Sequence, residues 1–550
     1  MQTASPEKIA HYRSLGWWGD TTTWQLFEQA AAADPGAVAL LDPANRQSFT
    51  SGRPLALSWG ELRARVLALA AEFARDGVSR GDVVVLQLPN TVESVASYLA
   101  LAALGAIVSP VPMQYGLHEL REIAHKLHPR AYVAAAHFRG EDFTARHAGA
   151  FTPDTRLIAL DHELLARDGA ADAAVIASGV SADEVYTICW TSGTTGTPKG
   201  VPRSHNQWLS QTLAMHGIGL EPGMTMLCPF PLVNMASITG FFFPWLQLRG
   251  RLVLHQPLDL GVFLAQIRDE RVAYTIAPPA VLNMLLQKRE LLAGADLSSL
   301  KLVASGSAPL APWMVRAFQE EFGIVVVNIF GSNEGMAFAS AGVDVPDPEQ
   351  RATLFPRFGV EGFAWSNPIA TRMRSRLVDI ETGAVITEPG HAGEMQIQGP
   401  NVIDGYFDTP AGSREAFSVD GWFRSGDMFE IAADAPRFYR FTGRCKDIIV
   451  RGGLKISPDE LDTLLGAHPQ LAEAAVAGYP DPVLGERVGA VVVPKPGEQP
   501  TLEDVTRYLE GRHIARNKLP EKLVTVDALP RNPLGKVVRA ALRGFLIDEP

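Results

Sequence analysis

Short apolar runs separated by amphipathic segments dominate the first 330 residues of the chain. Val83–Leu88 (VVVLQL) and Ala131–Ala135 (AYVAA) are apolar almost throughout, whereas Trp59–Asp76 and Leu258–Glu270 have the spacing of amphipathic helices. Strands that are apolar along their whole length are buried on both faces, which is typical of parallel sheets covered by helices. The pattern therefore predicts an α/β fold of parallel sheets covered by helices on both faces, with ligands at the loops that follow the strands. Further runs of this kind are Leu157–Leu160, Val185–Trp190, Met226–Pro229, Leu252–Leu254, Tyr274–Ala277, Leu302–Ala304 and Ile324–Ile329.

The pattern of apolar and turn-forming residues changes after residue 345. Short segments with many Gly and Pro turns indicate a small β-rich subdomain over about 346–443, inside a large N-terminal domain of 1–443. The last hundred residues read as a mixture of strands and helices, with helices expected at Pro458–Leu465 and Leu502–His513. Because one domain usually holds about 100–200 residues, we expect a separate small α+β domain over 447–550.

Charge and cysteine content narrow the class of protein. Lys and Arg number 49 and Asp and Glu 60, a formal net charge of −11, and no long basic run is present. This balance argues against nucleic acid as a partner, although a local anion site remains compatible with it. Three cysteines without a CxxC pair fit a reducing compartment. Val95–Met113, the most apolar stretch, is broken by Ser, Gly and Pro, so we expect a buried helix and strand, no membrane span, and a cytoplasmic enzyme.

One loop carries the clearest chemical signal. Thr191–Gly200 (TSGTTGTPKG) directly follows an apolar strand and combines hydroxyls, glycines and one lysine. Glycines let backbone N–H groups surround an anion, hydroxyls donate further hydrogen bonds, and Lys199 adds a positive charge. The spacing differs from GxxxxGK[ST], so the loop predicts a phosphate site other than a Walker A loop.

With this loop, the sequence resembles the acyl- and aryl-adenylating enzymes, which include acyl-CoA synthetases, aryl-acid ligases and peptide-synthetase adenylation domains. The resemblance covers nearly the whole chain and implies ATP-dependent conversion of a carboxylate to an acyl-adenylate, followed by transfer to a thiol. It implies ATP, Mg²⁺ and coenzyme A as ligands. It also implies a large N-terminal domain with parallel sheets in αβαβα layers, and a small C-terminal domain that moves about a hinge at 444–446. The motifs that carry it, in the family's order after the loop, are Ala304–Leu310 (ASGSAPL), Asn328–Gly335 (NIFGSNEG), Gly421–Asp427 (GWFRSGD), Gly443–Lys455 (GRCKDIIVRGGLK) and Pro530–Lys536 (PRNPLGK).

The resemblance assigns roles to single residues. Lys536 is the expected catalytic lysine that bridges the substrate carboxylate and the α-phosphate, and Glu334 is the expected Mg²⁺ ligand. Asp427 and Arg444 are expected to bind the ribose hydroxyls, and Phe330 to stack on adenine. The full set expected to contact ATP or AMP is Thr191, Ser192, Gly193, Thr194, Thr195, Lys199, Ser307, Ala308, Pro309, Asn328, Phe330, Gly331, Asn333, Asp427 and Arg444.

Two positions depart from the family pattern. Asn333 stands where Thr is usual before the glutamate, and its amide can still donate to phosphate. Phe330 stands where Tyr is commonest, which removes only a hydroxyl. Lys446 matches the hinge position, and Gly452 and Gly453 would let the thiol arm approach the backbone closely.

The acid itself is indicated only by class. The expected acyl pocket consists of Asn234, Met235, Gly306, Ser332 and Met336. These side chains are small or neutral, which favours a compact, mostly apolar acid that is aromatic, alicyclic or short-to-medium aliphatic. Within the family the chain is most similar to cyclohexanecarboxylate-type acid–CoA ligases and, less so, to dihydroxybenzoate-adenylating enzymes.

Three functions stay open at this point. The first is an acid–CoA ligase, favoured because no carrier domain is attached. The second is a free-standing adenylating enzyme that loads a phosphopantetheinyl carrier protein. The third is a nucleotide-binding protein without catalysis, against which Lys536, Glu334 and Asp427 argue. Hydrolase and metal-dependent alternatives have little support, since GxSxG is absent and His118, His125 and His128 lack HExxH spacing.

Overall fold

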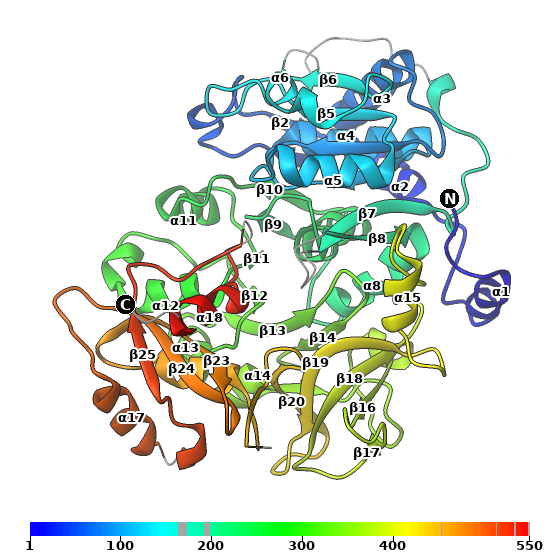
Figure 1. Ribbon diagram of the computed structural model, residues 1–550. Coiled ribbons are helices and arrows are strands. Elements are labelled where there is room, and N and C mark those ends of the chain that lie inside the picture. The colour runs from blue at the N-terminus through cyan, green and yellow to red at the C-terminus, as the bar shows by residue number, and fades with distance from the viewer. Residues whose placement is uncertain (163–172, 192–197, 453, 513, 533–534, 548–550) are drawn as a thin grey trace. The chain divides into compact units, whose positions relative to one another are not determined.

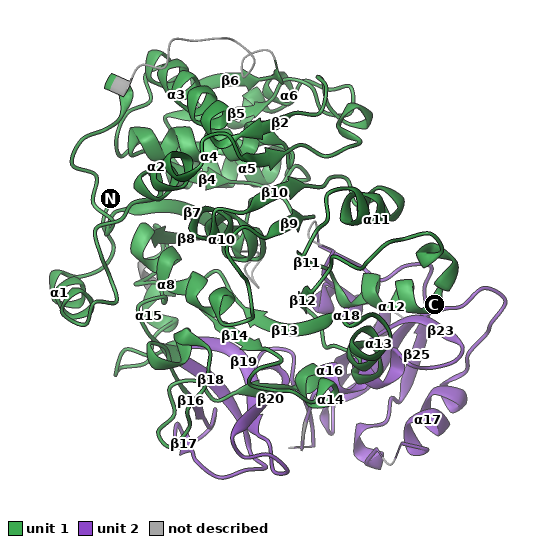
Figure 2. Cartoon of the chain, turned by 180° about the vertical axis from the view of Figure 1, so that it is seen from behind, with its two compact units in different colours: residues 1–375, 397–423 green, residues 376–396, 424–550 purple. Residues whose placement is uncertain are grey.

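The structure is a computed structural model that describes residues 1–162, 173–191, 198–452, 454–512, 514–532 and 535–547. The chain divides into two compact units (Figure 2). Unit 1 comprises residues 1–375 and 397–423, and unit 2 comprises residues 376–396 and 424–550. This division by packing differs in position from the predicted hinge at 444–446, which concerns movement and stays a prediction.

The first sheet of unit 1 contains the strands that the apolar runs predicted (Figure 1). Its order is β6-β5-β3-β4-β7-β8, with parallel pairing except for the antiparallel hairpin of β7 and β8. Every residue of β3 and β5 is buried, as a strand covered on both faces requires. The hairpin was not predicted, and its turn is the glycine-rich loop. The strands span Val83–Gln87 (β3), Ile107–Pro110 (β4), Ala131–Ala135 (β5), Arg156–Leu160 (β6), Val185–Thr191 (β7) and Lys199–Ser204 (β8).

The second sheet of unit 1 has the order β14-β13-β12-β11-β9-β10-β1-β2. Its interior pairs are parallel, and the edge strands β2 and β14 are antiparallel to their neighbours. The strands span Val38–Leu41 (β1), Ala56–Ser58 (β2), Thr225–Cys228 (β9), Arg251–Leu254 (β10), Tyr274–Ile276 (β11), Leu302–Gly306 (β12), Val325–Gly331 (β13) and Ala337–Ser340 (β14), and a short strand β15 covers Leu354–Pro356.

Helices cover these sheets and begin where capping residues allow. Ser58 and Glu61 form a capping box at the start of α3, and Ser204 and Gln207 form one at the start of α8. Helix α8 contacts both β8 and β14, so it lies between the two sheets, in agreement with the predicted layers. Among the described residues, the α-helices of unit 1 span Pro6–Ser14 (α1), Thr23–Ala33 (α2), Trp59–Arg75 (α3), Val92–Leu104 (α4), Leu117–Leu127 (α5), Phe143–His147 (α6), His205–His216 (α8), Met235–Ser237 (α9), Phe243–Leu248 (α10), Leu260–Asp269 (α11), Pro279–Gln287 (α12), Pro312–Phe322 (α13), Pro348–Thr353 (α14) and Pro410–Glu415 (α15).

The remaining strands form two sheets that belong largely to unit 2. In the first, β20, β19, β18, β16 and β17 are neighbours in that order, and β16, β18 and β19 run across the unit boundaries. In the second, β22-β21-β24-β23 are neighbours and β25 pairs with β24. The elements span Arg374–Val378 (β16), Val385–Ile386 (β17), Ala392–Gln398 (β18), Phe423–Ile431 (β19), Phe438–Arg444 (β20), Ile449–Arg451 (β21), Leu454–Ile456 (β22), Pro458–Leu465 (α16), Leu471–Asp481 (β23), Gly485–Pro494 (β24), Leu502–Glu510 (α17), Lys522–Thr525 (β25) and Arg539–Ile547 (α18).

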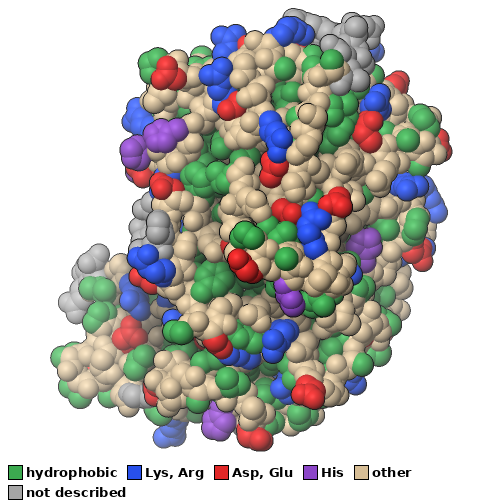
Figure 3. Space-filling model, turned by 90° about the vertical axis from the view of Figure 1, so that its right-hand side faces the viewer, with side chains coloured by type: hydrophobic (Ala, Val, Ile, Leu, Met, Phe, Trp, Pro, Cys, Tyr) green, Lys and Arg blue, Asp and Glu red, His purple; other side chains and the backbone are tan. Residues whose placement is uncertain are grey.

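On the face drawn in Figure 3, basic and acidic side chains are interspersed and form no continuous patch of one sign. Among the described residues, no helix combines the length and apolarity needed to cross a bilayer. Val95–Met113 forms most of the buried helix α4 and the buried strand β4, as expected.

Candidate functional site

The glycine-rich loop is held at both ends by the β7–β8 hairpin. Thr191 closes β7 and lies opposite Lys199, the first residue of β8. Lys126 of α5 donates a hydrogen bond of 2.8 Å to the carbonyl of Pro198, which fixes the second end of the loop. Ser192, Gly193, Thr194 and Thr195, which were predicted to contact phosphate, lie outside the described residues.

Tyr406 joins Lys199 to Glu334. The ammonium nitrogen of Lys199 lies 4.9 Å from the centroid of the Tyr406 ring, a cation–π distance. The Tyr406 hydroxyl donates a hydrogen bond of 3.1 Å to Oε1 of Glu334. Burial, and then the charge of Glu334, raise the pKa of Tyr406, so its hydroxyl stays protonated and remains a donor. Tyr406 therefore contacts both Lys199, at the end of the glycine-rich loop, and Glu334, the predicted metal ligand.

A tight turn after β13 presents Glu334. The amide of Gly335 donates to the carbonyl of Ser332 at 3.1 Å, and Ile403 donates to the carbonyl of Glu334 at 3.0 Å. Gly335 has φ +127°, and a Cβ there would lie 2.6 Å from the carbonyl oxygen of Asn401. Only glycine fits this close approach. The turn thus packs directly against the segment that carries Tyr406.

Arg203 supports the same turn from inside the protein. Its side chain is fully buried and donates to the carbonyl oxygens of Asn333 at 2.8 Å and Asn401 at 2.7 Å. It also donates to the carbonyl of Gln207, and its guanidinium lies 4.4 Å from the Trp208 ring centroid. Burial lowers the pKa of Arg203 to about 9, so the group is charged at neutral pH.

One residue of the predicted acyl pocket, Met235, is tied to this turn. The side-chain oxygen of Asn333 accepts a hydrogen bond of 2.8 Å from the amide of Met235, and the Met235 side chain packs over Gly331. Asn234 caps the short helix α9 by accepting from Ala236 at 3.0 Å. A π-helical segment, Ile238–Phe242, follows directly. Irregular helical turns of this kind are frequent at functional sites.

The residues predicted around adenine lie at the ends of β12 and β13. Gly306, which was predicted for the acyl pocket, packs directly against the carbonyl of Ile329, and Ser307 takes a left-handed conformation with φ +67°. Ser307, Ala308 and Pro309 are exposed, as residues that meet a ligand would be. Phe330 contacts Phe355 edge to face at 5.8 Å. Asn328 is buried and donates to the carbonyl of Ala352 at 2.8 Å, so its side chain also holds α14.

Ser332 and Met336, the other predicted pocket residues, bracket the Glu334 turn. The carbonyl of Met336 accepts hydrogen bonds from the Ser332 amide at 3.3 Å and from Nε2 of Gln211 at 2.8 Å. Met336 is fully buried and Ser332 is half-buried. Unit 1 therefore brings Lys199, Glu334, Asn333 and Met235 into one connected group.

In unit 2, the predicted ribose ligands lie opposite each other on neighbouring strands. Asp427 on β19 and Arg444 on β20 are paired in register, and their side chains form an ion pair of 3.2 Å. Asp427 is 7% exposed, and its backbone amide donates a hydrogen bond of 3.1 Å to the hydroxyl oxygen of Ser425. The ion pair and the strand register therefore orient both side chains without a ligand.

The predicted hinge and thiol-approach residues follow β20. Lys446 is exposed on a turn in which Asp447 donates its amide proton to the carbonyl of Arg444 at 3.0 Å. Gly452 has φ +56° and donates to the carbonyl of Leu484 at 2.7 Å. Gly453 lies outside the described residues.

Lys536 projects from a closed loop near the end of unit 2. Its amide donates to the side chain of Asn532 at 2.9 Å, and the amide of Asn532 donates back to the carbonyl of Lys536 at 2.8 Å. Arg531 and Val537 form an isolated bridge across the loop, and Gly535 turns the chain with φ +79°. The lysine side chain is exposed on a backbone that is fixed on both sides.

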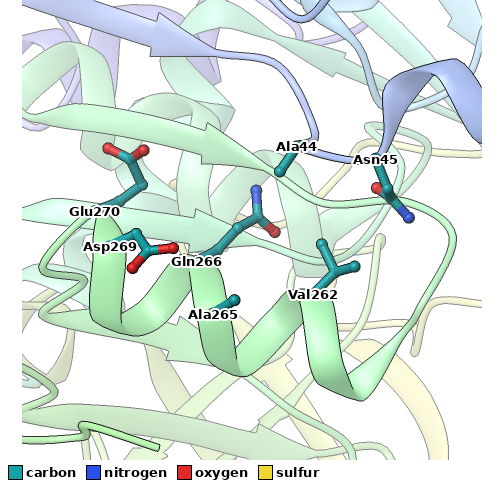
Figure 4. Close-up of a pocket in the computed structure, with 7 residues that line it drawn as sticks. All are labelled: Ala44, Asn45, Val262, Ala265, Gln266, Asp269 and Glu270. Carbon is teal, nitrogen blue, oxygen red and sulfur yellow. The ribbon is translucent and has the colours of Figure 1, made fainter.

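Two cavities in unit 1 are lined by residues other than these. One, of about 220 Å³, separates α11 from the loop before the short helical turn at Arg46–Ser48 (Figure 4). It is lined by Ala44, Asn45, Val262, Ala265, Gln266, Asp269 and Glu270, none of which was predicted to bind a ligand. A small apolar cavity of about 20 Å³ is lined by Pro229, Phe230, Leu258, Phe263, Ile276, Ala277, Pro278 and Val281, next in sequence to the predicted acyl pocket.

Sequence reasoning did not identify Tyr406, Arg203 or Lys126. Tyr406 lies in a loop and Lys126 in a helix, and no motif marks either residue. Each forms its hydrogen bond with a residue that is 72 positions away in the sequence. Arg203 had no clear local signal, because Lys199–Ser204 (KGVPRS) reads as a loop; only its burial in strand β8 shows that its charge requires specific partners.

Comparison with protein families agrees with the resemblance found in the motifs. The model of the AMP-binding enzyme family matches residues 27–407, and that of the AMP-binding enzyme C-terminal domain matches residues 460–536. The chain belongs to the AMP-binding enzyme family and is an adenylate-forming ligase.

Individual relatives extend over almost the full chain. A 2-hydroxy-7-methoxy-5-methyl-1-naphthoate–CoA ligase from Streptomyces carzinostaticus is 31% identical over 98% of this chain and 96% of its own length. An indoleacetate–CoA ligase from Aromatoleum aromaticum is 32% identical over 94% of this chain and 97% of its own. Among solved structures, ATP-bound MatB from Rhodopseudomonas palustris has a TM-score of 0.78 and 26% identity, covering 96% of this chain and 99% of that one. The predicted fold class is therefore confirmed.

Proposed function

We propose that this enzyme activates a small, mostly apolar carboxylic acid with ATP and passes the acyl group to coenzyme A, releasing AMP and pyrophosphate. The observation that carries the proposal is the connected group Lys199, Tyr406 and Glu334 at the glycine-rich loop. It joins a cation suited to phosphate with a carboxylate suited to a phosphate-bound metal ion.

In unit 1, the loop amides and Lys199 would bind the triphosphate, and Asn333 would donate to it from the turn after β13. Glu334 fits Mg²⁺ as a single protein ligand, because it is a half-buried hard oxygen donor whose other support is a neutral phenol. Mg²⁺ is commonly held by one or two carboxylates together with substrate phosphates. When bound, the ion would neutralise phosphate charge, while Glu334 and Tyr406 keep its place.

In unit 2, Asp427 would accept hydrogen bonds from the ribose hydroxyls beside Arg444, and Lys536 would bridge the carboxylate and the α-phosphate. A carboxylate oxygen attacks the α-phosphorus, and the bond from that phosphorus to pyrophosphate breaks. The thiolate then attacks the acyl carbon, and AMP leaves with the carboxylate oxygen. A lysine at the first step offsets the repulsion of two anions and stabilises the charge that develops on the α-phosphoryl group.

The acid class rests on the pocket residues and on the relatives. Met235 covers Gly331, and the described residues predicted for the pocket include no carboxylate that would pair an amino group. The two relatives above are named for aryl acids and for transfer to CoA. Together these observations favour an aromatic or alicyclic acid, with CoA as acceptor ahead of a carrier protein.

The test replaces Lys536 with Ala. We expect ATP–pyrophosphate exchange to fall by about 100-fold or more, because the lysine acts on charge that develops in the transition state. Conversion of a pre-made acyl-adenylate to the thioester should stay near its normal rate. Unchanged exchange would refute the role of Lys536, and failure of every acid in an aromatic, alicyclic and aliphatic panel would refute the acid class. A parallel assay with CoA and with a phosphopantetheinyl carrier protein separates the two acceptors.

A further inference from the structure

A group of three carboxylates surrounds one arginine three residues after Lys536. Arg539, the first residue of α18, forms ion pairs with Asp459 at 2.6 Å and with Asp462 at 2.9 Å through the same nitrogen. Its Nε lies 3.7 Å from the carboxylate of Asp447. These four residues are called the arginine cage below.

The arginine cage is largely shielded from water. The side chains of Arg539, Asp447, Asp459 and Asp462 are 16%, 19%, 21% and 24% exposed. Burial opposes the charge on Arg539, but the carboxylates outweigh it and raise the pKa of the arginine. Ion pairs that are shielded from solvent are far more consequential to break than exposed ones, because the remaining partner is left uncompensated.

The arginine cage connects segments that are distant in sequence. Asp447 follows the predicted hinge residue Lys446, while Asp459 and Asp462 lie on α16. Arg539 also donates to the carbonyl of Val476 on β23, and the amide of Val476 donates to Asp462 at 2.6 Å. One side chain thus joins the start of α18, the helix α16, the edge strand β23 and the turn after β20.

The loop that carries Lys536 is anchored at its two ends. At the first end, Arg531 pairs with Glu473 on β23 and donates to the carbonyl of Gly535 at 2.7 Å. At the second end, Arg539 enters its cage, and α18 continues by packing Leu542 and Leu546 on the sheet of β23 and β24. An exposed pair holds the first end, whereas the shielded cage holds the end nearer the hinge turn.

We propose that Arg539 is a positioning residue for Lys536, and that it couples the lysine loop to the hinge turn through Asp447. This inference rests on the role proposed above for Lys536. Since displacement of a reacting group by about 1 Å can cost about 100-fold in rate, release of one end of the loop is enough to impair adenylation. The thioester step, which does not use Lys536, is spared.

The test compares Arg539→Met and Arg539→Lys with Arg543→Met. Arg543 lies one turn further along α18, and its pair with Glu486 is exposed, so this control keeps the helix and spares the arginine cage. We expect Arg539→Met to lower kcat of ATP–pyrophosphate exchange by about 10- to 100-fold with little change in KM for ATP. Arg539→Lys should recover part of the loss, because an ammonium keeps the charge but cannot reach all partners at once. Arg543→Met should match the unchanged enzyme.

Further measurements separate positioning from folding. If Arg539 acts through Lys536, Arg539→Met should add no further loss to Lys536→Ala, and thioester formation from a pre-made acyl-adenylate should stay within about threefold. Should Arg539→Met fail to fold, Asp447→Asn releases only the hinge turn and should lower exchange several-fold. Equal loss of both half-reactions, or exchange like that of Arg543→Met, overturns the proposal. Full exchange in Lys536→Ala would instead overturn the function proposed for the enzyme.

Discussion

Arg203 in unit 1 and Arg539 in unit 2 are both shielded guanidinium groups, yet their surroundings are opposite. The hydrogen-bond partners that the described residues give Arg203 are neutral oxygens, chiefly the carbonyls of Asn333 and Asn401. Arg539 has two carboxylates within 3 Å and a third at 3.7 Å. Burial accordingly lowers the pKa of Arg203 to about 9, whereas carboxylates raise that of Arg539.

The difference indicates two uses of one side chain. Among the described residues Arg203 has no hydrogen bond to a carboxylate, and the charge of Glu334 acts on it only through space. Arg203 therefore places a positive charge behind the turn of Glu334, close to where anionic phosphates are proposed to bind, and such a buried charge is costly to retain. The arginine cage has a net charge of −2 when all three of its carboxylates are ionised. A proton bound by one carboxylate therefore reduces the repulsion among them. Burial raises the pKa of Asp462 to about 7. A buried cation that is bonded to neutral oxygens, as Arg203 is, raises the positive potential at a nearby site. A buried cation that is paired with carboxylates, as Arg539 is, instead holds separate segments of the chain together.

The largest expected effect tests the first half of this comparison. Arg203→Met should lower the free energy of unfolding by about 3 kcal/mol, because three buried carbonyls lose a charged donor. The loss should be the same at pH 6 and pH 8, since carbonyl oxygens do not titrate. Denaturant unfolding at both pH values measures this.

A matched control is Arg351→Met. Arg351 is also buried and bound by backbone carbonyls, those of Val326 and Val345 at 2.9 Å each. It should show the same independence of pH, while KM for MgATP changes only in the Arg203 variant. A cost for Arg203→Met that rises clearly with pH would mean that a carboxylate compensates Arg203, and the comparison would fail.

A smaller and pH-dependent effect is expected for Arg539→Met. Without the arginine, the pKa values of Asp459 and Asp462 in the folded state rise further. Between the ordinary aspartate pKa of about 4 and these raised values, the folded state binds protons that the unfolded state has already released. Stability then falls as pH rises from that value through the folded pKa. We expect a loss of about 1 kcal/mol at pH 6 and about 2 kcal/mol at pH 8, measured by the same unfolding experiment. Adding Asp462→Asn should flatten the slope, and a slope of the opposite sign would contradict the account.

The smallest effect sharpens the description of the site in unit 1. Tyr406→Phe removes the hydrogen bond to Glu334 but keeps the ring beneath Lys199. We expect KM for MgATP in pyrophosphate exchange to rise about 3- to 10-fold, with stability lowered by about 1 kcal/mol or less. Tyr508→Phe, which removes a hydroxyl in unit 2, serves as the control and should leave KM unchanged. A loss as large as that of Arg203→Met would mean that Tyr406, rather than Arg203, is the main support of the turn.

Local signals predicted most of the elements well. The helix expected at Pro458–Leu465 is α16 with the same bounds, and Trp59–Asp76 is α3 with Asp76 as its C-cap. Both follow from short-range rules, namely capping side chains and the period of the apolar residues. The β7–β8 hairpin was not predicted, because the segment Lys199–Ser204 contains Pro and Arg and reads locally as a loop.

By itself, the sequence determined the family, the αβαβα layering and the candidate residues from Lys199 to Lys536, because motifs and apolar periods are properties of neighbouring residues. Only the tertiary structure decided which groups support them. Arg203 reaches Asn333 across 130 residues, Tyr406 reaches Glu334 across 72, and Arg539 reaches Asp462 across 77. Such partners are chosen by packing and by the need to satisfy buried charges and polar groups, which no local pattern encodes.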